Sequence, residues 1–252
     1  MRDYKTETQK RIEFIQSVLK SAGADGIVFG NSGGKDCALT GILCKMACSN
    51  TLGIIMPCVS KRNYETDKID AEKIARQFDI ATCVIDLTDV RNRLVEAIGL
   101  SLGDNPGNSA LTNIAPRLRM TTLYAVAANK NMLVAGTGNR SEIYMGYFTK
   151  WGDGACDFNP IADLTVTEIY EFLKYLKAPE FIINKAPSAG LFDGQTDESE
   201  MGISYKSIDE FIFKLNENAV SKTEIGIIER FHNLSSHKRR MPLKYGEDTH
   251  DN

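Results

Sequence analysis

The chain has 252 residues, of which 42% are hydrophobic and 25% are charged, and its formal net charge is −3. These values exclude disordered and collagen-like classes, and no apolar run approaches the ~20 residues of a membrane helix. The slight acidity argues against a broad nucleic-acid surface, and the charged N-terminal stretch lacks the apolar core of a secretion signal. We therefore expect a cytoplasmic protein that binds neither nucleic acid nor a membrane.

Apolar runs alternate with helical periodicity through the first half of the chain. The pattern predicts strands over 25–30, 51–57, 80–87 and 131–137. It predicts a first helix that ends at Gly23 and further helices over 35–47, 66–79, 88–98 and 111–130. Strands that alternate with helices of this length form right-handed crossovers. We therefore predict an α/β fold: a doubly wound, Rossmann-like parallel sheet with helices on both faces.

The second half of the chain follows a different pattern. Residues 138–159 and 184–204 show neither period and are predicted to be long loops, which in compact domains are usually functional. Thr165 and Glu168 have the spacing of a capping box. Further helices are predicted over 165–176, 205–216 and 221–232. No linker or internal repeat divides the chain, so we expect one domain over residues 1–252.

A glycine-rich stretch follows the first predicted strand. Ligands of parallel sheets bind beyond the carboxyl ends of strands, where glycines and a helix N-terminus together suit a phosphate. The patterns G-x-x-x-x-G-K-[ST] and G-x-G-x-x-G are both absent, and a turn without a ligand is the alternative. The stretch is called the glycine loop (residues 30–37) below and consists of Gly30, Asn31, Ser32, Gly33, Gly34, Lys35, Asp36 and Cys37.

Asp36 is a carboxylate directly after Lys35, the lysine that we expect to bind phosphate. Alone, this carboxylate would repel an anion. A Mg²⁺ ion that bridges carboxylate and phosphate oxygens removes the conflict, because Mg²⁺ takes one or two carboxylates and completes its shell with phosphate and water. The sequence therefore predicts a magnesium site beside the glycine loop.

Residues 32–36 resemble the S-G-G-x-D loop of the adenine-nucleotide α-hydrolase superfamily, also called PP-loop ATP pyrophosphatases. Members of this superfamily cleave ATP between the α and β phosphates. More specific stretches, at 113–120, 136–164, 187–202 and 237–240, resemble the ammonia-dependent NAD⁺ synthetase family. The resemblance runs in order from residue 26 to about residue 240.

The family resemblance implies a two-step amidation. The nicotinate carboxylate of deamido-NAD⁺ attacks ATP and releases pyrophosphate; ammonia then attacks the adenylated carboxylate and releases AMP, which completes the last step of NAD⁺ biosynthesis. It also implies a homodimer with deamido-NAD⁺ at the subunit interface. Glutamine-using relatives carry an amidase domain for which this chain leaves no room, so free ammonia is the expected donor, with a separate glutaminase subunit as the alternative.

The resemblance also implies roles for individual residues. Asp36 and Glu142 would hold Mg²⁺, and Asp153 would accept a proton from ammonium, so that these three acids are the expected catalytic residues. Residues implied for ATP are the glycine loop, Thr137 and Ser188. Residues implied for deamido-NAD⁺ are Arg117, Lys150, Asp157, His237 and Lys238.

Two departures from the family pattern keep other functions open. Cys37 stands where a serine is usual, and Val166 stands where many relatives have an ATP-contacting lysine that Lys185 could replace. A non-catalytic nucleotide-binding sensor would tolerate both changes. Another enzyme of the superfamily, such as a tRNA-thiolating or GMP-synthesising one, is the second alternative, although thiolation usually needs paired cysteines and the chain has no C-x-x-C motif.

Overall fold

The computed structural model describes residues 2–104, 106–185, 196–214 and 220–246. At the centre of these ranges is a sheet of four parallel strands in the order β3-β2-β1-β4. The strands are β1 (Gly26–Gly30), β2 (Thr51–Ile55), β3 (Ala81–Val84) and β4 (Met132–Val134). Each strand leads into helices before the next one begins, so the predicted parallel α/β architecture is confirmed.

Helices cover both faces of the sheet, as predicted. Ile27 and Phe29 of β1 point into one core, whereas Val28 between them points into a second core on the opposite face. The second core contains α5 (Asn108–Lys130). The first contains α1 (Tyr4–Ala22), α2 (Lys35–Ala47), α3 (Lys68–Gln77), α7 (Val166–Tyr175) and α8 (Glu180–Ile183).

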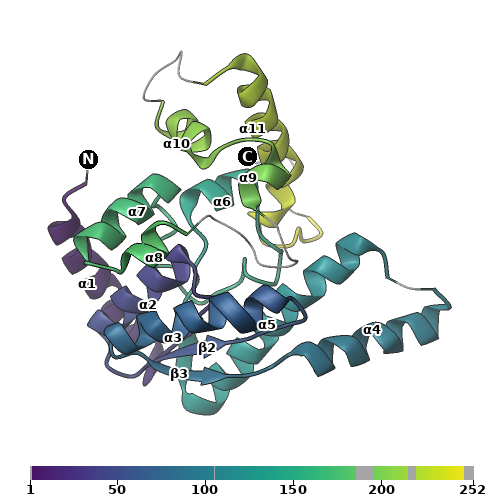
Figure 1. Cartoon of the computed structure of the whole chain (residues 1–252), viewed down its shortest axis with the longest axis horizontal. Helices are drawn as coiled ribbons and strands as arrows, with labels where there is room; N and C mark the ends of the chain where they lie inside the picture. Colours follow the sequence, from purple (N-terminus) through teal and green to yellow (C-terminus); the bar gives the residue numbers. More distant parts are fainter. Residues whose placement is uncertain (1, 105, 186–195, 215–219, 247–252) are drawn as a thin grey trace.

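A third apolar cluster joins the helices at the top of Figure 1. Met145, Ile208 and Ile228 are fully buried in it. These helices are α6 (Arg140–Met145), α9 (Asp197–Met201), α10 (Tyr205–Phe213) and α11 (Lys222–Leu234). Through this cluster the C-terminal helices α9, α10 and α11 pack against α6, which follows β4 in the chain.

The prediction of an uninterrupted loop over 138–159 was wrong, because α6 lies within it. Asn139 accepts the N–H of Glu142, and the Glu142 carboxylate accepts the N–H of Asn139, so a capping box starts this helix. A helix of six residues is too short to produce a readable period. The segment 184–204 likewise contains α9, while residues 186–195 lie outside the described residues.

Helix boundaries differ from the predicted ones around α4 (Thr88–Leu102) and α5. Helix α4 continues to Leu102, and α5 begins at Asn108, before the predicted start at 111. Three short elements were not predicted, since each is too short to show a period: α8, a π-helix η1 (Asn63–Asp67) and a 3₁₀ turn η2 (Ser236–Lys238).

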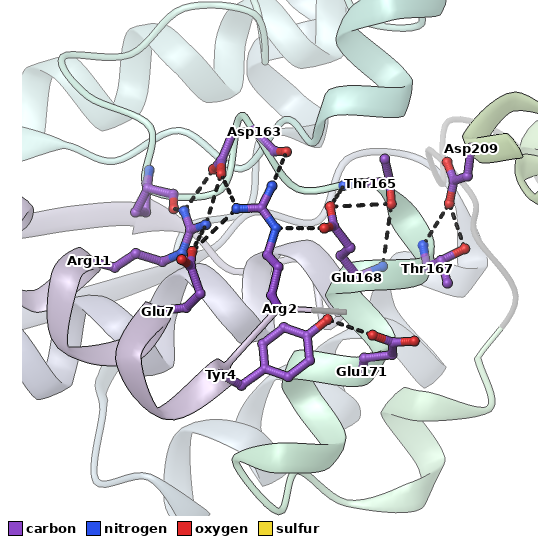
Figure 2. Close-up of polar contacts among 11 residues, drawn as sticks. Arg2, Tyr4, Glu7, Arg11, Asp163, Thr165, Thr167, Glu168, Glu171 and Asp209 are labelled. Atoms are coloured by element: carbon purple, nitrogen blue, oxygen red, sulfur yellow. Dashed lines mark hydrogen bonds and ion pairs between the residues drawn. The ribbon is translucent and has the colours of Figure 1, made fainter. Parts of the chain in front are cut away.

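Ionic contacts fasten α1 to the start of α7 (Figure 2). The Arg2 guanidinium donates to Glu168 at 2.5 Å and to Asp163 at 2.7 Å, and Arg11 donates to Asp163 at 2.8 Å. The predicted capping box of Thr165 and Glu168 is present, so Glu168 serves both the helix cap and the contact with α1.

Helix α4 extends away from the sheet, beside the start of α5 (Figure 1). None of its residues is buried, and the exposed fraction is 51% for Val90, 39% for Leu94 and 79% for Leu100. In the described ranges no helix is long and apolar enough to span a membrane.

Candidate active site

A cavity of about 970 Å³ lies at the carboxyl ends of β1, β2 and β4. This volume is in the range of sites that hold small molecules. Predicted site residues that line it are Gly30, Asn31, Ser32, Gly34, Lys35, Asp36, Cys37, Thr137, Glu142, Asp153 and Lys238. Gly33, Arg117, Lys150, Asp157 and His237 do not line it, and Ser188 lies outside the described residues.

The glycine loop is a tight turn that packs against the start of α3. Gly33 has φ +70°, and a Cβ atom there would lie 2.3 Å from the carbonyl oxygen of Asp67, so only glycine fits. The side chain of Asn31 donates to the carbonyl of Ala71 at 3.2 Å. No side chain caps the N-terminus of α2, so its first N–H groups are available to an anion.

Lys35 is buried and donates to the Asp36 carboxylate at 2.7 Å. Its ammonium group also lies 5.6 Å from the ring centre of Tyr205 and 6.0 Å from that of Tyr170. Burial lowers the pKa of Lys35, but Asp36 and Glu142 outweigh it and raise that pKa above its ordinary value. Lys35 is therefore charged at neutral pH.

Asn139 links the two acids predicted to hold a metal. Its side-chain amide donates to Asp36 at 2.9 Å, and its backbone N–H donates to Glu142 at 3.1 Å. Burial and the negative charge of Asp36 raise the pKa of Glu142, while Lys35 and the Asn139 N–H lower it. The net result is a pKa well above the ordinary value. The structure thus brings Asp36 and Glu142 together at a position where added positive charge is favourable.

Cys37 is buried beside the hydroxyl of Ser32, with 3.1 Å between sulfur and oxygen. Burial raises the pKa of the Cys37 thiol, and the contact with Ser32 lowers it only in part. The side chain is therefore a neutral thiol at physiological pH.

Asp153 faces the cavity and accepts the N–H of Thr149 at 3.0 Å. The residue as a whole is exposed, although protein atoms crowd around its carboxylate. That burial raises the pKa of Asp153, whereas the Thr149 N–H, Arg119 and Lys238 lower it. Lys238 itself is anchored by the carbonyls of Gly146 and Phe148, each at 2.8 Å.

Three other predicted residues form a connected group outside the cavity. The Arg117 guanidinium donates to the Lys150 carbonyl at 3.3 Å, and the Lys150 ammonium donates to the His237 carbonyl at 2.7 Å. Asp157 lies apart from them: it accepts the Val134 N–H at 2.7 Å and the Tyr124 hydroxyl at 3.2 Å. We call Arg117, Lys150 and His237 the outer group.

Sequence reasoning missed several residues of the cavity wall, including Arg62, Asn63, Asp67 and Arg119. Arg119 stands two residues after Arg117, and two helical residues differ by about 200° around the axis, so only one of them can face the cavity. The stretch 113–120 contains both arginines and was the signal that could have pointed to Arg119. Their positions around the helix axis would have predicted that Arg117 and Arg119 face opposite sides of α5.

Lys185, which sequence reasoning named only as a substitute for the lysine missing at Val166, lies in the cavity wall. It donates to the Gly33 carbonyl at 3.0 Å and pairs with Asp67 at 2.9 Å and Asp70 at 2.8 Å. Val166 is instead 4% exposed and packs in the third apolar cluster.

Known proteins resemble this chain over nearly its whole length. The NH(3)-dependent NAD(+) synthetase of Carboxydothermus hydrogenoformans is 46% identical over 95% of this chain and 97% of its own. The NMN synthetase of Francisella tularensis has a TM-score of 0.89 and 35% identity, over 98% of this chain and 100% of its own. The NH3-dependent NAD synthetase of Campylobacter jejuni has a TM-score of 0.77 and 32% identity, over 96% of this chain and 99% of its own. A model of the NAD synthase family matches residues 7–242, and this chain belongs to that family.

Proposed function

We propose that this protein is an ammonia-dependent NAD⁺ synthetase, which converts deamido-NAD⁺, ammonia and ATP into NAD⁺, AMP and pyrophosphate. One observation carries the proposal: a member of the NAD synthase family has one cavity that joins the glycine loop, the pair Asp36 and Glu142, and Asp153. A carboxylate is a poor acyl donor, so amidation requires that it first be activated by ATP. The glycine loop would take the terminal phosphates on its free N–H groups.

The adenine base of ATP would lie against the apolar part of the cavity wall. Ile54, Met56 and Leu123 line this part, next to the end of β2. Flat apolar surfaces suit a nucleobase, and the arrangement directs the triphosphate from this wall toward the glycine loop. The α-phosphate would then lie between the apolar wall and the glycine loop.

Asp36 and Glu142 fit a magnesium ion, because both are half-buried carboxylates with hard oxygen donors, and because burial and the negative charge of Asp36 raise the pKa of Glu142. The described residues contain no cluster of three or more His, Cys, Asp or Glu side chains arranged for a metal, so phosphate and water would complete the shell. When bound, the ion supplies positive charge to the phosphates. Asn139 orients both acids through its two hydrogen bonds.

Asp153 would accept the proton that ammonium must lose before it attacks. A general base works best when its pKa lies near the operating pH, and burial raises the pKa of Asp153 in that direction. Lys238 would hold the negative substrate close to Asp153. Its two carbonyl contacts fix the ammonium group beside the cavity.

We propose that the protein works as a homodimer with deamido-NAD⁺ between the subunits. The outer group lies beyond the cavity, so a dinucleotide that enters the cavity by its nicotinate end could reach it with its other nucleotide. The exposed apolar side chains of α4 would be covered by a second copy. All six cysteines are free thiols, which suits the reducing cytoplasm.

The direct test is to supply purified protein with deamido-NAD⁺, ATP, Mg²⁺ and ammonium and to follow NAD⁺, AMP and pyrophosphate. We expect all three products, with pyrophosphate release that depends on deamido-NAD⁺. Glutamine in place of ammonium should give no NAD⁺ unless a separate glutaminase is added. Folded protein that makes no NAD⁺ from the complete mixture would reject the proposal, and binding of ATP without turnover would favour the sensor.

NMN synthesis is a second candidate, favoured by the structural similarity to the NMN synthetase of Francisella tularensis. The same chemistry on nicotinic acid mononucleotide would not require the outer group. A comparison of kcat/KM for the two deamido substrates decides between them. If the dinucleotide is the substrate, Lys150→Ala should raise its KM, whereas the KM of the mononucleotide should not change.

A further inference from the structure

Arg119 is a cationic side chain of the cavity that the mechanism above leaves without a role. It extends from α5 and is held by two hydrogen bonds: Nε donates to the Met56 carbonyl at 3.1 Å, and Nη2 donates to the Asn63 side chain at 3.0 Å. A guanidinium has five N–H donors in one plane. The two bonds fix that plane and leave the remaining N–H groups of Nη1 and Nη2 for another acceptor.

The charge of Arg119 is not balanced by a neighbouring carboxylate. Two other cations of the cavity are paired with carboxylates: Lys35 with Asp36, and Lys185 with Asp67 and Asp70. Among the described residues, no carboxylate lies within 4.0 Å of the Arg119 guanidinium. Burial lowers the pKa of Arg119, and the nearby negative groups do not compensate for it. A desolvated guanidinium stays charged, so it is stabilised by an anionic ligand.

The anchors of Arg119 place it between the two halves of the cavity. Met56 follows β2, beside the apolar wall that suits adenine. On the other side, Asn63 donates to Asp67 at 3.2 Å, and Lys185 connects Asp67 to the Gly33 carbonyl of the glycine loop. These contacts form a continuous chain of polar bonds from Arg119 to the glycine loop. Asp67 is the last residue of η1, and π-helical turns often lie at functional sites.

Arg119 also lies near the part of the cavity where we place the second reaction. Its positive charge lowers the pKa of Asp153, as does that of Lys238. The guanidinium is therefore flanked by the expected sites of the base, the terminal phosphates and the deamido substrate. With ATP and the deamido substrate placed as proposed above, the α-phosphate of ATP is the group that lies between these three sites.

We propose that Arg119 is a catalytic residue that donates to the non-bridging oxygens of the α-phosphate during adenylation; the assignment rests on the proposed function. In this step a nicotinate carboxylate oxygen bonds to the α-phosphorus. The bond from that phosphorus to the oxygen bridging the α and β phosphates breaks, and pyrophosphate leaves with the electron pair. Negative charge grows on the non-bridging oxygens, and a planar guanidinium can bind two of them at once. The same contact favours departure of AMP after ammonia attacks.

The test measures adenylation alone, as exchange of labelled pyrophosphate into ATP with deamido-NAD⁺, Mg²⁺ and no ammonia. Arg119→Gln should lower kcat for exchange by about 100-fold or more, the usual effect of removing a donor to a transition-state oxyanion. The KM for ATP should change little, because the glycine loop still holds the terminal phosphates. The matched control is Arg76→Gln, which replaces an exposed arginine on α3 that donates to the Glu72 carbonyl of the same helix, and it should exchange at the wild-type rate.

A second measurement separates catalysis from structure. Added guanidinium should restore part of the exchange activity of Arg119→Ala, whereas an arginine that only supports Met56 and Asn63 would lower thermal stability without such rescue. If Arg119→Gln does not fold, Arg119→Lys keeps the charge and is measured in the same way, with an expected kcat loss because two bonds to one phosphate are no longer possible.

Three results would overturn the assignment. Wild-type exchange by folded Arg119→Gln removes Arg119 from the mechanism, and a higher KM for ATP with normal kcat reduces it to a ground-state contact. Absence of guanidinium rescue in folded Arg119→Ala assigns it a structural role. A wild-type protein without exchange rejects the proposed function itself, and that result is visible before any variant is made.

Discussion

The carboxylates of Asp36 and Glu142 depend on each other through Asn139. The side-chain amide of Asn139 donates to Asp36, and its backbone N–H donates to Glu142. Lys35 balances part of the negative charge of the two acids. In such a network the loss of one acid changes the protonation of the other, since the charge of Asp36 contributes to the raised pKa of Glu142. At the residue scale, the site is therefore a single electrostatic unit.

Replacement of either acid tests its place in the reaction. We expect Asp36→Ala and Glu142→Ala each to lower metal-dependent turnover by at least about 100-fold, because each removes one of the two carboxylates proposed to hold magnesium. Both acids line the cavity and neither belongs to an apolar core, so the fold should persist. Circular dichroism and NAD⁺ production check the two parts of the prediction. A variant that turns over at the wild-type rate would remove that acid from the mechanism.

Cys37→Ser tests the one residue of the glycine loop that departs from the expected serine. We expect near wild-type activity, because a neutral buried thiol and a hydroxyl of similar size can make the same contact with Ser32. The raised pKa of the thiol also predicts slow reaction of Cys37 with alkylating reagents at neutral pH. Mass spectrometry measures that rate. A large gain or loss of turnover in Cys37→Ser would show that the thiol itself matters.

Charged groups join α1 to the start of α7, in addition to the apolar core that the two helices share (Figure 2). Arg2 and Arg11 both reach Asp163, and the Tyr4 hydroxyl donates to Glu171 at 2.7 Å. The contacts fasten the N-terminal helix to the segment that leads out of α6 toward α7. At the element scale this clamp supports the cavity wall without contributing to it.

Asp163→Asn tests the clamp through its pH dependence. Burial raises the pKa of Asp163, but Arg11 and Arg2 outweigh it, so the pKa lies below its ordinary value in the folded chain. The carboxylate therefore stabilises the fold above the unfolded pKa of about 4, and this stability is lost as the pH falls through the lower folded pKa. The side chain is 54% exposed, so we expect the variant to lose less than about 1 kcal/mol at neutral pH.

Urea unfolding at neutral pH and near pH 3 measures this difference for the wild type and the variant. The gap between them should shrink in acid, because the stabilisation from the Asp163 carboxylate declines as the pH falls from its unfolded pKa toward its lower folded pKa. A gap of equal size at both pH values would show that the contact is not electrostatic.

Helix α4 gives the molecule an exposed apolar arm (Figure 1). A helix with no fully buried residue gains little from the core of its own chain, and its exposed apolar side chains are stabilised when another surface covers them. Together with the outer group, this arm is the part of the molecule that we expect to meet a second copy. The whole-molecule proposal is thus a dimer in which the substrate site extends beyond one subunit.

The double variant Val90→Glu with Leu94→Glu tests the dimer. It should shift the sedimenting species from a dimer to a monomer of 27.9 kDa, because two buried carboxylates at an interface are costly. Ile69→Glu is the control, since Ile69 is 47% exposed on α3 and should leave the assembly unchanged. A wild-type protein that sediments as a monomer, or a double variant that stays dimeric, contradicts the proposed interface.

Much of the fold could be predicted from local sequence patterns. Alternating strands and helices predicted the parallel sheet, and Thr165 with Glu168 predicted the capped start of α7, because period and capping are properties of neighbouring residues. The same logic failed for α6, whose capping box at Asn139 and Glu142 lies in a polar stretch without a period. Short helices depend on tertiary packing, which local patterns do not contain.

The sequence by itself determined the fold class and the position of the glycine loop, and it predicted roles for the acids, since each depends on short-range order or on one motif. Only the tertiary structure decided which of these residues share a cavity. It turned Arg119 inward and Arg117 outward, joined Asp36 to Glu142 through Asn139, and paired Lys185 with Asp67 across a long sequence separation. Such placements follow from helix phase and from packing between distant segments, so they exist only once the chain has folded.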